Sequence, residues 1–253
     1  MDIDQEKLAR TSTGQLGLLV SVRDSREALV VEQAGVDVLD VKEPRNGPLG
    51  KSEDKVIAEI LSSVRSSTIV SIALGDIDDC ERYLKSNSIP EGVRLAKCGL
   101  ALSIHSDWRN RISKVWESIR ESCDPVAVAY SDFEQCDAPQ PIDIVKLAGQ
   151  QGVKFLLLDT YLKNGTSSLD LLNEDELTSL VERAKQFGMV TVLAGSLRHQ
   201  HLPAATRTGF DLIGVRGAVC SGERIEGVDS SLLNELKNQI CFCNRDQQME
   251  VKS

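Results

Sequence analysis

Two lysines stand at the ends of apolar, strand-like runs, where an amine is well placed to do chemistry. Lys42 ends the run VDVLDVK, and Lys97 lies at the end of VRLAKCG. Strand alternation places Lys42 on the same face as Asp40. A partly desolvated lysine near other cations loses basicity from a reference pKa of about 10.4, and its neutral amine can form an imine with a carbonyl. Alternatively, each lysine forms a structural ion pair with an acid such as Asp40 or Asp159.

Polar side chains also follow other expected strands. Charged groups are depleted in buried strands unless they are paired, so their concentration at strand ends indicates a site. We therefore treat as further site candidates the residues at or just beyond these ends, which are Ser21, Arg23, Asp76, Asp132, Asp159 and Lys163.

Two glycine-containing turns, LAGS (193–196) and GVRGAVCSG (214–222), end the last two expected strands. In barrels of parallel strands, backbone N–H groups at these positions commonly bind phosphate, and an arginine can add a charge-assisted hydrogen bond. The alternative is that the glycines only make turns. A phosphate site beside an imine-forming lysine predicts a sugar-phosphate or triose-phosphate substrate. The predicted phosphate-binding residues are Gly195, Ser196, Gly214, Arg216 and Gly217.

The segments that must position these residues alternate between strand-like and helix-like patterns. A glycine precedes most of the apolar runs and is a natural helix C-cap. Eight alternating units predict a single-domain α/β protein, a (β/α)8 TIM barrel over 14–240 with polar extensions at 1–13 and 241–253. An open doubly wound sheet is the alternative, but no G-x-G-x-x-G follows the first strand. The strands are expected within 14–22, 34–42, 67–76, 91–99, 124–132, 151–160, 187–196 and 208–217.

The composition limits the class of protein and its partners. The chain has 253 residues, of which 41% are hydrophobic and 26% charged, as in ordinary soluble globular proteins. Its net charge of -9 disfavours nucleic-acid binding, which depends on clustered Lys and Arg. No window approaches the roughly 18 apolar residues that a membrane span requires. The N-terminal stretch lacks a basic region followed by an apolar one, so we expect a cytoplasmic location.

The cysteines and histidines do not indicate a metal site. The seven cysteines form no C-x-x-C pair, and only three histidines are present. We therefore expect no metal and no cofactor. The sequence leaves a homo-oligomeric state open.

Several blocks, in order along the chain, carry a family resemblance. They are LLVSVRD, DVLDVKEPRNGPLG, AKCGL, LLLDTYLKNG, VLAGSL and DLIGVRGAVCSGERIEG. Spread over about 16–230, they resemble the (5-formylfuran-3-yl)methyl phosphate synthase family. The resemblance implies a TIM-barrel lyase that condenses two glyceraldehyde 3-phosphate molecules into a furan aldehyde phosphate, with loss of phosphate and water. In that family the reaction is an early step of methanofuran or methylofuran biosynthesis.

The resemblance also implies roles for individual residues. The D-V-K match makes Lys42 the Schiff-base lysine, and the K-x-G-L match makes Lys97 the acid/base lysine. Asp40, Asp159 and Lys163 fall on positions that assist catalysis. The chain departs from the family pattern after the sixth strand, where K-N-G replaces the expected K-D-G, and over 101–124.

Two other functions share parts of this pattern. A Schiff-base aldolase of another sugar-phosphate specificity would use the same lysines without eliminating phosphate. A non-catalytic sugar-phosphate-binding barrel would bind the ligand without forming an imine.

Overall fold

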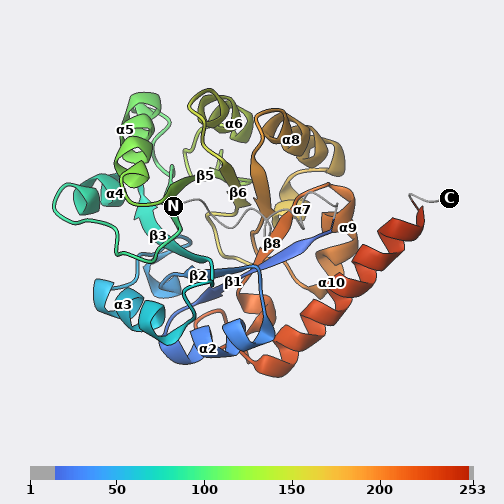
Figure 1. The fold of residues 1–253 in the computed structure, drawn as a ribbon. Helices are drawn as coiled ribbons and strands as arrows, with labels where there is room; N and C mark the ends of the chain where they lie inside the picture. Colours follow the sequence, from blue (N-terminus) through green and yellow to red (C-terminus); the bar gives the residue numbers. More distant parts are fainter. Residues whose placement is uncertain (1–14, 251–253) are drawn as a thin grey trace.

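The computed structural model describes residues 15–250 as a closed barrel of eight parallel strands. Each strand pairs with its neighbour in chain order, and the last strand pairs with the first. Helices surround the barrel, as Figure 1 shows in a view along its axis. The predicted single-domain (β/α)8 TIM barrel is therefore confirmed, and the open-sheet alternative is excluded.

Every segment expected to contain a strand contains one. The strands are β1 (Gly17–Val22), β2 (Val38–Val41), β3 (Val70–Asp76), β4 (Leu95–Gly99), β5 (Asp124–Tyr130), β6 (Phe155–Asp159), β7 (Val190–Leu193) and β8 (Leu212–Val215). The helices are α2 (Ser25–Ala34), α3 (Asp54–Ser63), α4 (Ile77–Leu84), α5 (Trp108–Arg120), α6 (Pro141–Gln150), α7 (Ser168–Leu171), α8 (Glu174–Gln186), α9 (Leu202–Arg207) and α10 (Ser230–Glu250).

Helix α2 shows how the local sequence sets these boundaries. The side chain of Asp24 accepts hydrogen bonds from two backbone N–H groups of the first turn, those of Arg26 and Glu27. Gly35 ends the helix with a φ of +68°, a left-handed conformation that glycine adopts without a steric penalty. The chain then turns directly into β2, so the helix end fixes where that strand begins.

Alternation along the strands divides their side chains between two buried layers. In β2, Leu39 and Val41 pack in the large core that also contains helix residues, whereas Val38 packs in the smaller core inside the barrel. Asp40 has the same parity as Val38, and so has Lys42 just beyond the strand. Both candidate side chains therefore belong to the inward-facing set, as the sequence predicts.

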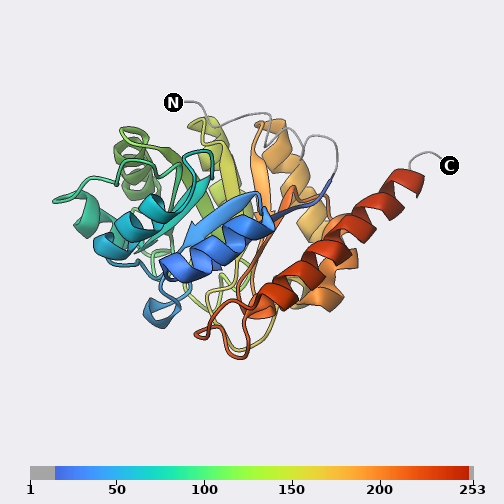
Figure 2. The same cartoon turned by 60° about the horizontal axis from the view of Figure 1, so that its bottom comes forward.

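Helix α10 extends past the expected end of the barrel. We predicted a polar tail from residue 241, but the helix continues to Glu250 along the outside of the molecule (Figure 2). Asn244 explains part of this difference, because its side chain accepts from the backbone N–H of Leu16 (2.8 Å) and donates to the Leu16 carbonyl (3.2 Å). The predicted extension at 1–13 lies outside the described residues.

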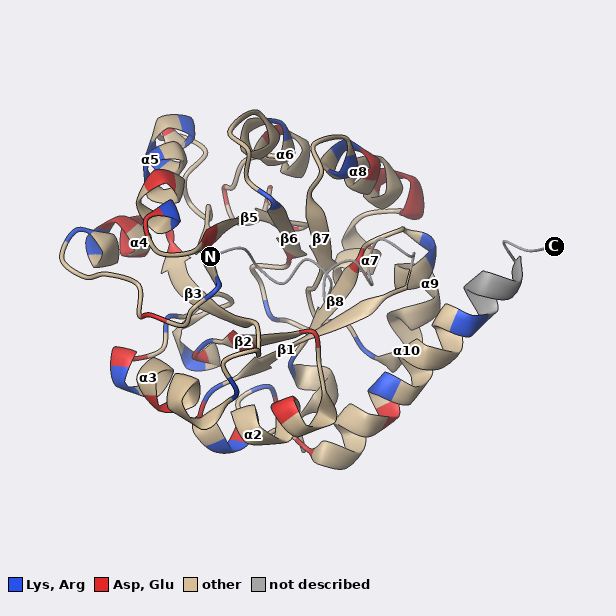
Figure 3. Ribbon diagram, viewed as in Figure 1, with Lys and Arg blue, Asp and Glu red and all other residues tan. Residues whose placement is uncertain are grey.

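The outer helices carry charges of both signs. Lys and Arg are interspersed with Asp and Glu on α3, α4, α5 and α8 (Figure 3). Within residues 15–250, none of the helices combines the length and the apolar character that crossing a lipid bilayer demands.

Candidate active site

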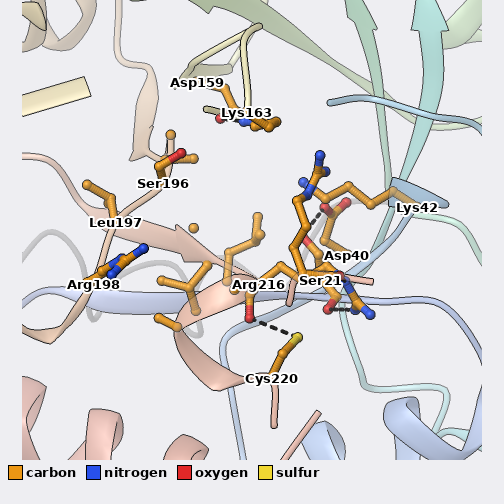
Figure 4. Close-up of a pocket in the computed structure, with 18 of the residues that line it drawn as sticks. Ser21, Asp40, Lys42, Asp159, Lys163, Ser196, Leu197, Arg198, Arg216 and Cys220 are labelled. Atoms are coloured by element: carbon orange, nitrogen blue, oxygen red, sulfur yellow. Dashed lines mark hydrogen bonds and ion pairs between the residues drawn. The ribbon is translucent and has the colours of Figure 1, made fainter. Parts of the chain in front are cut away.

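A pocket of about 800 Å3 opens at the carboxyl ends of the barrel strands (Figure 4). This volume is within the usual range for small-molecule sites. The residues that line it include the predicted catalytic and phosphate-site residues and one further candidate; they are Ser21, Asp40, Lys42, Lys97, Asp159, Lys163, Gly195, Ser196, Gly214, Arg216 and Gly217. The remaining candidates, Arg23, Asp76 and Asp132, lie outside this lining.

Asp40 is the centre of a buried hydrogen-bonded cluster at one side of the pocket. Its Oδ1 accepts from Nζ of Lys97 and from Oγ of Ser71 (3.0 Å), and its Oδ2 accepts from Oγ of Ser21 (2.9 Å). Burial by itself would raise the pKa of Asp40, but the charges of Lys97 and Lys42 outweigh that effect and hold the pKa below its usual value. Asp40 is therefore a carboxylate at neutral pH.

Asp159 and Lys163 form a second ion pair across the pocket from Asp40. Nζ of Lys163 donates to Oδ1 of Asp159 at 2.6 Å and to Oγ1 of Thr160 at 3.2 Å. Burial opposes ionisation of Asp159, but the charges of Lys163 and Lys42 lower its pKa. Asn164, where the resemblance led us to expect Asp, accepts from the backbone N–H of Thr166 (3.1 Å) and so supports the loop.

Lys42 differs from the other two pocket lysines. Its side chain is 8% exposed, and it makes no hydrogen bond or ion pair with any residue in the part of the chain that the structure describes. Burial lowers its pKa from 10.5 to about 8, although the charges of Asp159 and Asp40 act in the opposite direction. The nearby ammonium groups of Lys163 and Lys97 add to the lowering.

This arrangement gives the pocket one lysine amine whose pKa is lowered toward neutrality. With a pKa of about 8, roughly a tenth of Lys42 is unprotonated at pH 7, compared with well under a thousandth for an ordinary lysine. Lys97 and Lys163 are each bound to a carboxylate and can deliver or accept protons beside it. The sequence alone left open whether the lysines were nucleophiles or ion-pair partners. The structure pairs Lys97 and Lys163 with carboxylates and leaves Lys42 unpaired among the described residues.

The turn after β7 approaches its neighbours closely. Gly195 and Ser196 both have positive φ, +90° and +53°, and a Cβ at position 195 would lie 2.3 Å from Oγ of Ser168. Ser168 in turn donates to the carbonyl oxygen of Ala194 at 2.8 Å. Among the described residues, the backbone N–H groups of Ser196 and Leu197 have no acceptor. The turn is thus held in a strained conformation that leaves donors available beside the pocket.

Arg216 lines the pocket wall, but its guanidinium group is committed to protein acceptors. Nη1 donates to Oε2 of Glu27 (2.8 Å) and to the Ser21 carbonyl (2.8 Å), and Nη2 donates to Oε1 of Glu27 (3.2 Å) and to the Glu226 carbonyl (2.9 Å). Nε donates to the Arg224 carbonyl at 2.5 Å. These bonds use all of the N–H donors of a guanidinium. In this arrangement Arg216 has no free N–H donor for a phosphate, and its guanidinium ties together the segments around the pocket.

Asp76 is also structural in this state. Its Oδ1 accepts from the backbone N–H of Ala101 and from the hydroxyl of Tyr130, both at 2.9 Å. Burial raises the pKa of Asp76, and these two hydrogen bonds only partly offset the effect. It ties the end of β3 to the loop after β4 outside the pocket lining.

Asp132 and Arg23 hold loops at the barrel mouth. The carboxylate of Asp132 accepts from the backbone N–H groups of Tyr161 and Leu162, both at 2.7 Å, and so shapes the loop that carries Lys163. Arg23 donates from Nη1 to the carbonyl of Ile225. Both residues act on the site through the backbone of neighbouring loops.

Sequence reasoning missed three residues that matter to this geometry. Ser71 could have been found, because strand alternation in STIVSIALGD places a polar side chain inside the barrel. Glu27 carries no such signal, since it is one acid among several on an amphipathic helix. Arg224 lies in a loop whose path the sequence does not reveal. In residues 15–250, no group of three His, Cys, Asp or Glu side chains is arranged to hold a metal ion.

A closed parallel barrel with lysines and carboxylates gathered at the carboxyl ends of its strands defines a TIM-barrel protein with its site in the usual place. Phosphoribosyl anthranilate isomerase from Thermus thermophilus has a similar fold, with a TM-score of 0.58 at 10% identity, covering 90% of this chain and 99% of that chain. This likeness concerns the fold alone.

The sequence comparisons specify the family. The family model described as 4-HFC-P synthase matches residues 18–237. The (5-formylfuran-3-yl)methyl phosphate synthase of Methanosarcina mazei is 30% identical over 227 residues, covering 87% of this chain and 97% of the relative. That of Methanothermobacter thermautotrophicus is 30% identical over 231 residues, covering 88% and 98%. The chain belongs to the 4-HFC-P synthase family and is an enzyme, and the resemblance seen in the sequence is confirmed.

Proposed function

We propose that this enzyme condenses two molecules of glyceraldehyde 3-phosphate into (5-formylfuran-3-yl)methyl phosphate. The atoms balance when one inorganic phosphate and two water molecules leave. Family membership and the names of the relatives support this reaction. We further propose that the product feeds the biosynthesis of a methanofuran-type or methylofuran-type carrier. A cytoplasmic location remains a prediction.

The nucleophile in this proposal is Lys42, and a single observation carries the assignment. Lys97 and Lys163 are bound to carboxylates, whereas Lys42 has no such partner in the described part of the chain and has a pKa of about 8. Its amine adds to the aldehyde carbon of one triose phosphate, and loss of water forms an imine.

The imine makes the later steps possible. It withdraws electrons and acidifies the hydrogen on the adjacent carbon, C2. Once a base takes that proton, the C3–O bond can break and release phosphate, or the enamine carbon can attack the aldehyde of the second triose. Ring closure and dehydration then produce the furan and free Lys42.

Lys97 is the acid/base group in this scheme, and Asp40 holds it in place through their hydrogen bond. Lys163, bound to Asp159 at 2.6 Å, is a second proton carrier on the other side of Lys42. In both pairs, Lys97–Asp40 and Lys163–Asp159, the lysine proton lies next to a carboxylate. A proton can therefore be transferred within the site without leaving an isolated, uncompensated charge in a buried environment. The route uses protein side chains only.

The phosphate of a bound triose is placed at the ends of β7 and β8 in this proposal. The free N–H groups of the strained turn at Ser196 and the lack of side chains at Gly195, Gly214 and Gly217 support that position. Arg216 is left out because its donors are already used.

Borohydride trapping followed by product analysis tests the proposal. We expect incubation with glyceraldehyde 3-phosphate and reduction to label Lys42, and the unreduced enzyme to release the furan aldehyde phosphate. Lys42→Arg should remain folded, give no adduct and make no product, because a guanidinium stays protonated and is not a nucleophile. Lys146→Arg, an exposed lysine on α6, is the matched control and should behave as wild type.

Other outcomes would replace this function. An adduct at Lys97 or Lys163 would overturn the choice of nucleophile. An adduct at Lys42 with an aldol product that retains both phosphates would identify a Schiff-base aldolase. Binding without any adduct would identify a non-catalytic sugar-phosphate-binding barrel.

A further inference from the structure

The loop that follows β8 is fastened by two arginines through three consecutive carbonyl groups. Arg216 donates to the carbonyls of Arg224 (2.5 Å) and Glu226 (2.9 Å), and Arg23 donates to the carbonyl of Ile225 between them. The backbone of residues 224–226 is therefore held at the mouth of the barrel by bonds that do not involve its own side chains.

A single carboxylate connects the two anchoring arginines. Glu27, which is 5% exposed, accepts from both terminal nitrogens of Arg216 at 2.8 and 3.2 Å. It also accepts from the backbone N–H of Arg23 at 2.9 Å. This buried charge network spans α2, β1 and β8, so the loop position is set by the barrel itself.

The side chain of Arg224 extends from this fixed backbone into the pocket. It lines the same pocket as Lys42 and is partly buried there. Among the residues that the structure describes, none accepts a hydrogen bond from its guanidinium group. Burial lowers the pKa of Arg224 despite the nearby charge of Asp159, and the group nevertheless remains a cation. A desolvated cation without an acceptor is a ready site for an anion.

The other cations of the pocket are less suited to this role. Lys42 has no acceptor among the described residues either, but the proposed function assigns its amine to the imine. Lys97 and Lys163 are bound to Asp40 and Asp159, and Arg216 has no free donor. Arg198 also lines the pocket but is exposed, so water screens its charge. Arg224 combines partial burial, free donors and a fixed backbone.

We propose that Arg224 binds a phosphate group of the ligand in this pocket, with its planar guanidinium donating to the phosphate oxygens. This inference deepens the proposed function by naming the charged residue that recognises the substrate phosphate. The sequence pattern predicted this phosphate-binding role for Arg216, and the inference assigns it to Arg224. Arg216 instead holds the loop that carries Arg224.

Inorganic phosphate is the first probe, because its binding does not depend on any reaction. We expect calorimetry to show that Arg224→Ala binds phosphate at least tenfold more weakly than wild type, which is the scale for losing a charged hydrogen bond. Arg224→Lys retains the positive charge but loses the planar pair of N–H donors that a guanidinium offers to a phosphate. This variant should bind phosphate with intermediate affinity. Arg82→Ala, at an exposed arginine on α4, removes the same charge and should leave binding unchanged.

The anchoring network makes the Ala variant a clean test. The bonds to position 224 use its backbone carbonyl, so truncating the side chain leaves them intact and the thermal unfolding midpoint should not change. If Arg224→Ala binds phosphate as wild type does, or if wild type binds none at millimolar concentration, the inference is wrong.

A second probe separates this inference from the proposed function. In borohydride trapping, Arg224→Ala should need a much higher concentration of glyceraldehyde 3-phosphate for half-maximal labelling, whereas labelling by glyceraldehyde, which lacks the phosphate, should match wild type. An equal loss with both aldehydes would indicate a structural role and overturn the inference. If no aldehyde labels the enzyme but phosphate binding still requires Arg224, the proposed function fails and the phosphate site stands.

Discussion

Nζ of Lys97 donates a hydrogen bond to Oδ1 of Asp40, and both side chains are almost fully buried, at 2% and 1% exposure. This relationship assigns Lys97 a charged partner and leaves Lys42, two residues after Asp40, without one among the described residues. Breaking a buried ion pair costs several kcal/mol, so Lys97 is held in place, whereas the Lys42 side chain has no such interaction to break within residues 15–250.

The first prediction concerns the acid/base role of Lys97. Lys97→Arg keeps the positive charge near Asp40 but cannot release a proton near neutral pH. We expect this variant to form the trapped imine at Lys42 yet to release furan product at least about 100-fold more slowly, the scale of lost general acid/base catalysis. Turnover close to wild type would show that only the positive charge of Lys97 matters. Asp159 or Lys163 would then be the acid/base group.

The second prediction concerns the pH dependence of imine formation. Only the neutral amine of Lys42 is nucleophilic, and the pKa of this group is about 8. The rate of single-turnover trapping should therefore rise as the pH increases through 7 and 8 and level off above about 9. Rapid quenching with borohydride across this range measures it. A rate that keeps rising up to pH 10.5 would show that Lys42 has an ordinary lysine pKa.

The third prediction concerns the stability cost of Lys42. The pKa of Lys42 is about 8 in the folded protein, whereas an ordinary lysine has a pKa of 10.5. Below pH 8 the amine is protonated in both states, and its charge costs more free energy in the buried folded site than in the solvated unfolded chain. This difference corresponds to about 3 kcal/mol. Lys42→Met should therefore be more stable than wild type by up to that amount at pH 7.

The advantage of Lys42→Met should shrink between pH 8 and 10.5, because the folded wild-type protein then releases the proton that its unfolded chain retains. Urea unfolding at pH 7 and pH 10 measures both values. A variant that is less stable than wild type at pH 7 would contradict the inferred cost.

The fourth prediction concerns Arg216 as an anchor. Arg216→Ala leaves Glu27 buried without its main partner, and we expect a loss of about 3 kcal/mol in the free energy of unfolding. The double variant Glu27→Gln with Arg216→Met, which removes both charges, should recover part of that loss. Unchanged stability in Arg216→Ala, with only a raised KM, would instead restore Arg216 as a phosphate ligand.

The fifth prediction concerns the turn after β7. In Gly195→Ala, the new Cβ would lie 2.3 Å from Oγ of Ser168 and 2.9 Å from Cγ2 of Thr160, so we expect a loss of about 2 to 4 kcal/mol and a clear loss of turnover. Gly188→Ala is the matched control, because its φ is also positive at +69° but nothing lies within 4 Å. It should cost only about 1 kcal/mol and leave turnover unchanged. Equal losses in the two variants would show that conformation alone, and not the close approach, matters.

Local patterns were sufficient to predict the fold. The runs ending at Lys42, Lys97 and Asp159 alternate between two faces with the period of a strand, and glycine C-caps such as Gly35 mark where helices end. These signals depend on backbone geometry over a few residues, so a sequence carries them without knowledge of the rest of the molecule. The end of α10 was missed because its last turns depend on distant contacts such as that between Asn244 and Leu16.

The pairing of charges could not be predicted in the same way. Lys97 and Asp40 are 57 positions apart, and Arg216 and Glu27 are 189 apart. Which amine meets which carboxylate depends on the register of the closed barrel and on the paths of its loops. The sequence identified Arg216 as the cation of the phosphate site because it stands beside a glycine turn, and it offered no sign that Glu27 would occupy its donors.

By itself, then, the sequence determined the alternating units, because these follow from short-range periodicity. The number of units, eight, predicted closure into a barrel and therefore the edge at which the candidate residues gather. Only the tertiary structure decided that, of the three lysines lining the pocket, Lys42 is the one without a carboxylate partner among the described residues. It also decided that Arg224 rather than Arg216 faces the pocket with free donors. The reason is physical: a buried charge takes its character from the groups within a few ångströms of it, and folding brings those groups together from distant parts of the chain.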